Sequence, residues 1–272
     1  MSRIVTLFLA ILLALPAGTE EPRPLLLAST TSTENTGLFD AILPDFEKQT
    51  GIPVRVVAVG TGQALLLARS GDADVLLVHD RASEDRFVKE GYGVERFDVM
   101  TNDFVVVGPP DDPAAIRGEP GIARALGRIA ASESRFVSRG DDSGTHKAEM
   151  RQWRAAGIDP LAASGRWYLE LGSGMGATLN TAAAMGAYAL ADRGTWLAFR
   201  NRGDLDLVVE GDPRLANPYS VIAVNPARHP HVNARAAERF IEWIRSPPAQ
   251  RAIGAFRVGG EPLFVPSARP PG

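Results

Sequence analysis

The sequence predicts an α/β protein built as two lobes. Short apolar runs alternate along the chain with helical segments that end on glycine, a pattern typical of βαβ units and a mostly parallel sheet. The alternation falls into two sets, separated by a strand that runs into a proline- and aspartate-rich turn within 102–113. With 272 residues, the chain is long enough to bury two cores.

The first set predicts three strand–helix pairs. The run 24–29 is short and apolar, and the run 53–59 is rich in the β-branched residues that strands favour. Leucine, isoleucine and phenylalanine recur at helical spacing within 36–51 and predict a helix that ends on Gly51. We expect strands at 24–29, 53–59 and 74–79 and helices at 36–51, 62–71 and 83–91.

The second set repeats the same alternation and ends in a tail rich in proline and glycine. Its helices again close on glycine or at a polar stretch, and its strands are short and apolar. We expect strands within 102–113 and at 135–138, 166–171, 187–192, 205–211 and 217–226, and helices at 122–132, 144–157, 175–186, near 194–200, at 232–246 and near 247–256.

The order of these elements predicts that the chain crosses twice between the lobes. The first lobe is then discontinuous, made of 24–103 and 222–272, and the second lobe is 109–218. The crossovers are expected near 104–108 and 219–224. The alternative on the pattern alone is one large doubly wound sheet.

The N-terminus predicts a secretory signal peptide at 1–21. A positively charged start precedes an apolar run at 4–17, which ends on small residues and an acidic stretch. The run is too short to span a membrane comfortably, and cleavage is expected between Ala17 and Glu21. A buried N-terminal helix is the alternative, but the run ends abruptly at the acidic stretch.

Composition narrows the class of protein further. The chain is 45% hydrophobic and 22% charged, as in an ordinary soluble protein, and it has no cysteine. Zinc–thiolate, redox and thiol chemistry are thereby excluded, and so is a lipid anchor on cysteine. The net charge of -3 does not indicate a basic surface for nucleic acid, so a nucleic-acid-binding protein is set aside. Together with the signal peptide, these features predict a soluble periplasmic protein.

Three clusters of small and hydroxyl residues stand where a strand ends and a helix begins. They are "ASTTSTENTG" at 28–37, "VGTGQ" at 59–63 and "SRGDDSGTH" at 138–146. Ligands of open α/β sheets bind beyond the carboxyl ends of the strands, and helix N-termini offer unpaired N–H groups to anions. Each cluster taken alone also fits plain helix capping. Taken together, the three predict an anion site lined by donors.

Arg139 is the strongest candidate for an anion contact among the three clusters, because a guanidinium can give two parallel N–H bonds to a tetrahedral oxyanion. The alternative is a salt bridge from Arg139 to Asp141 or Asp142, and both can hold at once. Gly144 and Thr145 would open the following helix toward the anion, with Asp142 or Ser143 as its cap.

A fourth glycine-rich loop, "LGSGMGATLN" at 171–180, also follows a strand and opens a helix. It matches the dinucleotide pattern weakly, because no acidic residue stands at the expected distance at the end of the next strand, and Asp192 comes too early. We expect a further donor loop here, with Thr178 as a possible contact.

A metal site and a catalytic site are two further interpretations, and both have weaker support. The histidines of "HPH" at 229–231 lack a nearby carboxylate partner for a metal. Ser143 and His146 could in principle serve an exported hydrolase, but the G-x-S-x-G elbow is missing. We therefore expect no metal centre and no catalytic residue.

With these clusters, the sequence resembles the TupA-like family of tungstate-binding periplasmic proteins of ABC transporters. The likeness runs from about Leu25 to Phe256, and its signature is S-R-G-D-x-S-G-T-H, complete at 138–146. A second signature, a TTTS-like run, reads Ser29-Thr30-Thr31-Ser32, so serine replaces its first threonine but keeps the hydroxyl.

The resemblance implies a type II periplasmic binding protein, with a mixed sheet flanked by helices in each lobe and the ligand in the cleft. It implies that tungstate, and molybdate usually more weakly, is captured there and passed to a membrane permease and its ATPase. No cofactor is implied. The candidate contacts, carried over by motif with Thr178 added from its loop, are Thr31, Ser32, Thr61, Arg139, Ser143, Gly144, Thr145 and Thr178.

Two other functions remain open on the residues alone. A phosphate-binding protein of the same fold carries similar Arg/Asp/Ser-Gly-Thr clusters, and Asp141 or Asp142 could accept the proton of phosphate. Tungstate is a bare dianion near neutral pH and needs donors only. The exported serine hydrolase is the alternative from another class.

Overall fold

The structure, a computed structural model, describes residues 23–269. The signal peptide predicted at 1–21 lies outside the described residues. Among the residues described, no helix is long and apolar enough to cross a membrane.

Strands and helices alternate along the described chain, as expected. The strands are β1 (Leu25–Thr30), β2 (Val54–Val59), β3 (Val75–Val78), β4 (Gly93–Gly108), β5 (Phe136–Ser138), β6 (Tyr168–Glu170), β7 (Ala189–Asp192), β8 (Asp206–Val209), β9 (Ala216–Val224), β10 (Arg257–Val258), β11 (Glu261–Pro262) and β12 (Val265–Pro266). The helices are α1 (Thr31–Glu34), α2 (Leu38–Thr50), α3 (Thr61–Ser70), α4 (Arg81–Lys89), α5 (Ile122–Ala131), α6 (Gly144–Ala155), α7 (Met175–Met185), α8 (Arg193–Ala198), α9 (Ala234–Ile244) and α10 (Pro247–Ala255), with 3₁₀ turns η1 (Pro160–Ala163) and η2 (Pro213–Leu215).

A mixed sheet forms the centre of the first lobe. Its strand order is β12-β4-β9-β3-β1-β2. β1 runs parallel to β2 and β3, whereas β9 runs antiparallel to β3 and β4. Because β1 and β2 are parallel, their carboxyl ends lie at the same edge of the sheet, where ligands of this architecture bind.

The long strand β4 continues into the second lobe. It pairs with β9 from Gly93 to Asp103 and with β7 and β8 from Phe104 to Gly108. β5 pairs in parallel with β6 and makes a parallel bridge to Tyr188 just before β7. The second lobe therefore also has a mixed arrangement of strands.

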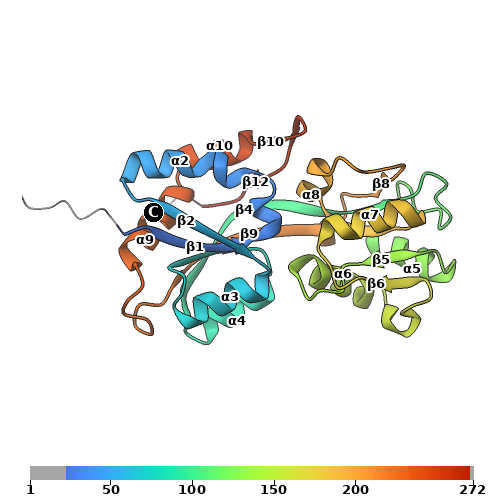
Figure 1. The fold of residues 1–272 in the computed structure, drawn as a ribbon, viewed down its shortest axis with the longest axis horizontal. Coiled ribbons are helices and arrows are strands. Elements are labelled where there is room, and N and C mark those ends of the chain that lie inside the picture. The colour runs from blue at the N-terminus through green and yellow to red at the C-terminus, as the bar shows by residue number, and fades with distance from the viewer. Residues whose placement is uncertain (1–22, 270–272) are drawn as a thin grey trace, which may run out of the picture.

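The buried cores follow the same division. Phe46 and Phe240 pack edge to face at 5.3 Å on one side, and Phe136 and Trp153 do so at 5.2 Å on the other. Figure 1 shows β4 and β9 running between two groups of elements, with α2, α3, α4, α9 and α10 on one side and α5 to α8 on the other.

From these contacts we propose where the lobes divide. β4 changes partners between Asp103 and Phe104, and on the return path Leu215 belongs to one core and Tyr219 to the other. The second connection is thus placed just before 219–224, because that expected crossover segment lies inside the first-lobe sheet. We call 23–103 with 216–269 the first lobe and 104–215 the second.

Several elements differ from the sequence expectation, and three of them bear on the sheet or the site. β4 begins at Gly93, well before 102–113, because exposed charged residues interrupt its apolar pattern. α1 is an extra helical turn, capped by the Thr30 hydroxyl, which accepts from Thr33 N at 3.3 Å. β12 forms within the tail, and its Pro266 is tolerated because the strand lies at the sheet edge.

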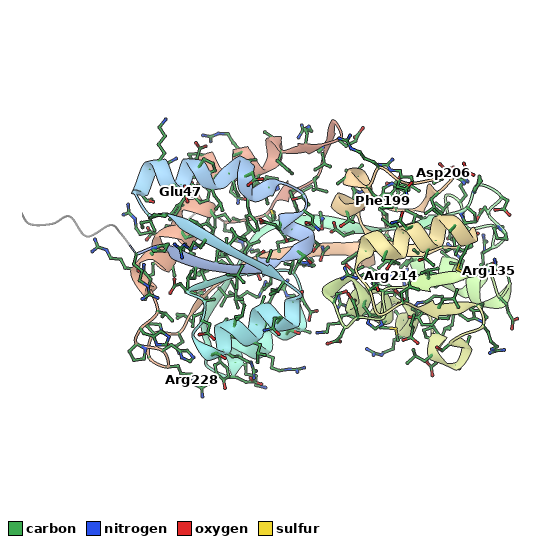
Figure 2. All side chains as sticks on the ribbon, in the orientation of Figure 1. Glu47, Arg135, Phe199, Asp206, Arg214 and Arg228 are labelled. Atoms are coloured by element: carbon green, nitrogen blue, oxygen red, sulfur yellow. The ribbon has the colours of Figure 1, made fainter. Side chains whose placement is uncertain are left out.

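Charged side chains lie on the outer faces of both lobes. Glu47 and Arg228 lie on the first lobe and Arg135 and Asp206 on the second, as Figure 2 shows. The polar residues between the lobes are different, because most of them are buried.

Candidate functional site

Three strand ends lead into helices where the two lobes face each other. β1 runs into α1, β2 into α3, and β5 leads through a short loop to α6. Between them lies a cavity with about 20 Å³ of space for the centre of a water-sized sphere, room for one compact group. Its lining comes from both lobes: Thr30, Thr31, Ser32, Val59, Gly60, Thr61, His79, Arg139, Ser143, Gly144 and Thr145.

The structure brings together all but one of the residues predicted for the site. These are Thr31, Ser32, Thr61, Arg139, Ser143, Gly144 and Thr145. Thr178 is the exception and is described below.

The starts of α3 and α6 supply backbone donors to this region. The helical hydrogen-bond ladder begins at Ala64 N in α3 and at Lys147 N in α6. The N–H groups of Thr61, Gly144 and Thr145 precede these points, so they have no acceptor within their helices. The same helix ends carry partial positive charge, which favours an anion.

Thr61 gives a direct sign of a missing partner. Its side chain is 1% exposed, and its Oγ1 finds no hydrogen-bond partner among the described residues. A buried hydroxyl without a partner is costly, so it needs an acceptor that the described chain does not supply. A Cβ on Gly144 would lie 3.0 Å from this Oγ1, which shows how closely the two lobes approach at the cavity.

Arg139 makes the salt bridge foreseen as its alternative role and also lines the cavity. Its Nε and Nη2 donate to Asp141 Oδ2 at 3.1 and 2.5 Å. Burial acts to raise the pKa of Asp141, but hydrogen bonds from Arg139 and Ser143 hold it below its usual value. Of the described lining residues, Arg139 alone is a permanent charge, and Asp141 orients it.

His79 and Thr30 also line the cavity, and the sequence reasoning missed both. His79 Nε2 lies 3.1 Å from Thr30 Oγ1 and 3.3 Å from Ser32 Oγ. His79 follows β3, at the same sheet edge as the predicted clusters. That position was the signal that could have identified it.

A buried polar chain fixes the state of the His79 ring. Asn217 donates its amide to Asn102 Oδ1 at 2.8 Å, so its own Oδ1 faces His79 Nδ1 at 3.1 Å. His79 Nδ1 then carries the proton, and Nε2 accepts from the Thr30 or Ser32 hydroxyl. Burial lowers the pKa of His79 despite the nearby carboxylate of Asp192, so the ring is neutral.

Comparison with known proteins identifies the family. The sequence pattern of the PBP superfamily domain matches residues 16–248. The tungstate-binding protein TupA of Peptoclostridium acidaminophilum is 48% identical over 254 residues, which are 92% of this chain and 88% of that protein. The chain belongs to the TupA family of tungstate-binding proteins.

Solved structures of the TupA family agree in fold. The tungstate-binding protein TupA of Desulfovibrio alaskensis G20 is 46% identical with a TM-score of 0.82, over 91% of this chain and 100% of that one. The tungstate ABC transporter structure from Geobacter sulfurreducens is 46% identical with a TM-score of 0.78, over 86% and 98%. The predicted fold class and the family resemblance are confirmed.

In this TupA-family chain, the glycine-rich loop at 171–174 holds the Arg139 segment and does not line the cavity. Ser173 N donates to the Arg139 carbonyl at 3.1 Å. Thr178 is fully buried in α7, and its hydroxyl donates to Gly174 O at 3.2 Å. The structure therefore does not place Thr178 with the other predicted contacts.

Glu149 lies behind the Arg139 loop as a buried carboxyl group. It accepts hydrogen bonds from Tyr168 Oη at 2.7 Å, Ser138 Oγ at 2.8 Å and Trp153 Nε1 at 3.1 Å. Burial raises the pKa of Glu149 to about 7, although these three hydrogen bonds act to lower it. The protonated form is therefore the one that the folded state favours up to near neutral pH.

This raised pKa predicts a pH-dependent loss of stability. The stability linked to protonated Glu149 is fully present below the ordinary pKa of 4.5 and is lost as pH rises through about 7. Glu149→Gln should flatten that fall, by up to about 3 kcal/mol in unfolding free energy. Urea unfolding between about pH 5 and pH 8 measures it. Glu133→Gln, at an exposed position of the same lobe, is the control; equal slopes for Glu149→Gln and the wild type would contradict the prediction.

The geometry around Ser143 and His146 is that of a helix cap. Ser143 Oγ accepts from the His146 backbone N at 3.3 Å, and His146 Nδ1 accepts from Asp142 N at 3.1 Å. Ser143 is therefore the cap residue, and its hydroxyl is not paired with the imidazole ring. Within residues 23–269, no three His, Asp or Glu side chains are grouped to hold a metal ion.

Proposed function

We propose that this chain captures tungstate, and molybdate, and delivers the oxyanion to an ABC transporter. The observation that carries the proposal is the convergence of donors from both lobes on one compact cavity with a single permanent charge, that of Arg139. Family membership and the missing partner of the Thr61 hydroxyl point in the same direction.

The lining favours a fully deprotonated anion over phosphate. Monoprotonated phosphate needs an acceptor for its proton, and the carboxylates considered for that role are used elsewhere. Asp141 accepts from Arg139 and from Ser143 N, and Asp142 is exposed and lies 3.4 Å from Lys147. His79 Nε2 already accepts from the Thr30 or the Ser32 hydroxyl. Tungstate needs donors only.

The proposed role is binding and delivery without catalysis. The relatives in the TupA family are tungstate-binding proteins, and Ser143 lacks the imidazole contact that would activate it as a nucleophile. We propose that the protein works in the periplasm, after export by the N-terminal signal peptide. Its partners would be a membrane permease and the ATPase that drives it.

Titration calorimetry against four oxyanions tests the proposal. Tungstate and molybdate should each bind at one ion per chain, while sulfate and phosphate compete poorly, because a site that fits the larger tungstate tetrahedron holds these smaller anions less well. Equally tight binding of phosphate or sulfate would contradict the proposal, and turnover of an ester substrate that is lost in Ser143→Ala would favour the hydrolase instead.

Thr61→Val should separate binding from folding. The substitution removes a hydroxyl that has no partner in the described chain, so the free energy of unfolding without anion should not fall. The affinity for tungstate should fall about tenfold, because one hydrogen bond to a charged group is lost.

Thr178→Val is the matched control and should behave in the opposite way. It removes a buried hydroxyl with a partner, Gly174 O, so it should lower stability and leave tungstate affinity unchanged. Calorimetry and thermal unfolding of both variants measure the two effects. Unchanged affinity in Thr61→Val would remove this hydroxyl from the site.

A further inference from the structure

One ion pair joins the two lobes beside the cavity. Arg151 Nη1, on α6 of the second lobe, donates to Asp80 Oδ1 of the first lobe at 3.0 Å. Asp80 is 4% exposed in its side chain, whereas Arg151 is 46% exposed. Among residues 23–269, the other side-chain hydrogen bonds between the lobes involve Asn102, Asp103 or Asn217, which lie where β4 and β9 connect the lobes.

The pair is attached directly to the site on both sides. Asp80 follows His79, which lines the cavity, and α6 begins at the cavity with Gly144. Arg151 stands two turns along that helix, about 10 Å from its start. Asp80 and Arg151 also line a neighbouring groove of about 410 Å³ together with Asn217 and Pro218 of β9.

We propose that Asp80 and Arg151 form a latch that holds the lobes closed over the bound anion. The proposal rests on the proposed function, since it concerns retention of that anion. The Asp80 carboxylate is buried and receives hydrogen bonds only from Ser83 Oγ, at 2.5 Å, and Arg151 among the described residues. Separation of the lobes would remove Arg151 and leave the Asp80 charge to be hydrated.

The latch predicts a slower release of the anion without a contact to it. The interaction exists only when the lobes are closed, so it stabilises the closed complex and lowers the dissociation rate. Because Arg151 is nearly half exposed, we expect a moderate effect, about three- to tenfold in dissociation rate. The effect should weaken at high salt.

The direction of the change in dissociation rate separates the latch from long-range electrostatics. Asp80→Asn removes a negative charge near the anion, so a purely through-space effect would slow dissociation. The latch predicts the opposite, faster dissociation, for both Asp80→Asn and Arg151→Ala. The double variant should be no faster than the single variants, because both remove the same interaction. Arg154→Ala, at an exposed position on the same helix, is the matched control.

The measurement uses fluorescent labels on opposite lobes, which the absence of cysteine makes straightforward. Leu66→Cys and Leu161→Cys place them at side chains that are 53% and 48% exposed. Tungstate is displaced from the labelled protein by excess unlabelled wild type, and energy transfer reports reopening. Faster reopening in Asp80→Asn and Arg151→Ala, but not in Arg154→Ala, is the expected result.

Other outcomes assign failure to one proposal or the other. Unchanged or slower release from Asp80→Asn overturns the latch while tungstate binding stands. If the wild type binds phosphate and not tungstate, the proposed function fails, and the same variants with phosphate decide the latch. If it binds neither anion, both proposals fall.

Discussion

Arg139→Ala should weaken tungstate binding at least tenfold. Arg139 is the permanent charge in the cavity lining, and each charge-assisted hydrogen bond to the anion is worth about 1.5–3 kcal/mol. The substitution also leaves Asp141 without its partner beside the site, which adds repulsion. Titration calorimetry gives the affinity directly.

Arg135→Ala is the matched control for this change, because Arg135 precedes the same strand, β5, but lies exposed on the outer face (Figure 2). It should bind tungstate like the wild type. Both variants should keep the fold, since Ser143 N still holds Asp141 at 3.2 Å. Wild-type affinity in Arg139→Ala would exclude Arg139 from the anion site.

Substitutions at Gly144 should reduce tungstate affinity in proportion to side-chain size. A Cβ there would lie 3.0 Å from Thr61 Oγ1 and 3.1 Å from His79 Cε1, both on the opposite lobe. Alanine therefore pushes the lobes slightly apart, and valine also occupies part of a cavity of about 20 Å³. We expect a loss of at least tenfold for Gly144→Val and a smaller loss for Gly144→Ala.

Gly176→Ala controls for the effect of adding a methyl group near a helix start. Gly176 lies in the first turn of α7, and a Cβ there meets no atom within 4 Å. It should change neither affinity nor stability appreciably. Equal affinity of Gly144→Val and the wild type would mean that the lobes do not close on this residue when the anion binds.

The two-lobed α/β fold could be predicted because its signals are local. Helices that end on glycine and short apolar strands can be recognised within ten or so residues, and their alternation implies βαβ units. The start of β4 could not be found in this way, since exposed residues such as Glu95 and Asp98 hide it. The point where β9 leaves the second lobe depends on which strands it pairs with, and that information is not local.

The site could be predicted to the extent that one rule of sheet geometry applies. Thr31, Thr61 and Arg139 follow strand ends that meet, so their clusters converge as expected. Thr178 satisfies the same local pattern, but its loop packs behind Arg139. His79 carried no cluster of glycines or hydroxyls to mark it, although it follows a strand at the same edge.

Contacts between residues that are far apart in the sequence cannot be predicted from such local patterns. The contact of Asp80 with Arg151 joins residues 71 positions apart in the sequence and depends on how the lobes close. The sequence likewise does not indicate that Glu149 is buried, because its burial depends on contacts with Tyr168 and Ser138. Buried polar residues of this kind are found only from packing.

A crystal structure with bound tungstate tests the central claim most directly, because the anomalous scattering of tungsten locates the ion without ambiguity. We predict one tungsten position per chain, in the cavity between the lobes, with oxygens within hydrogen-bond distance of Thr61, Arg139 and the start of α6. A tungsten position outside this cavity, or contacts from one lobe alone, would contradict the account.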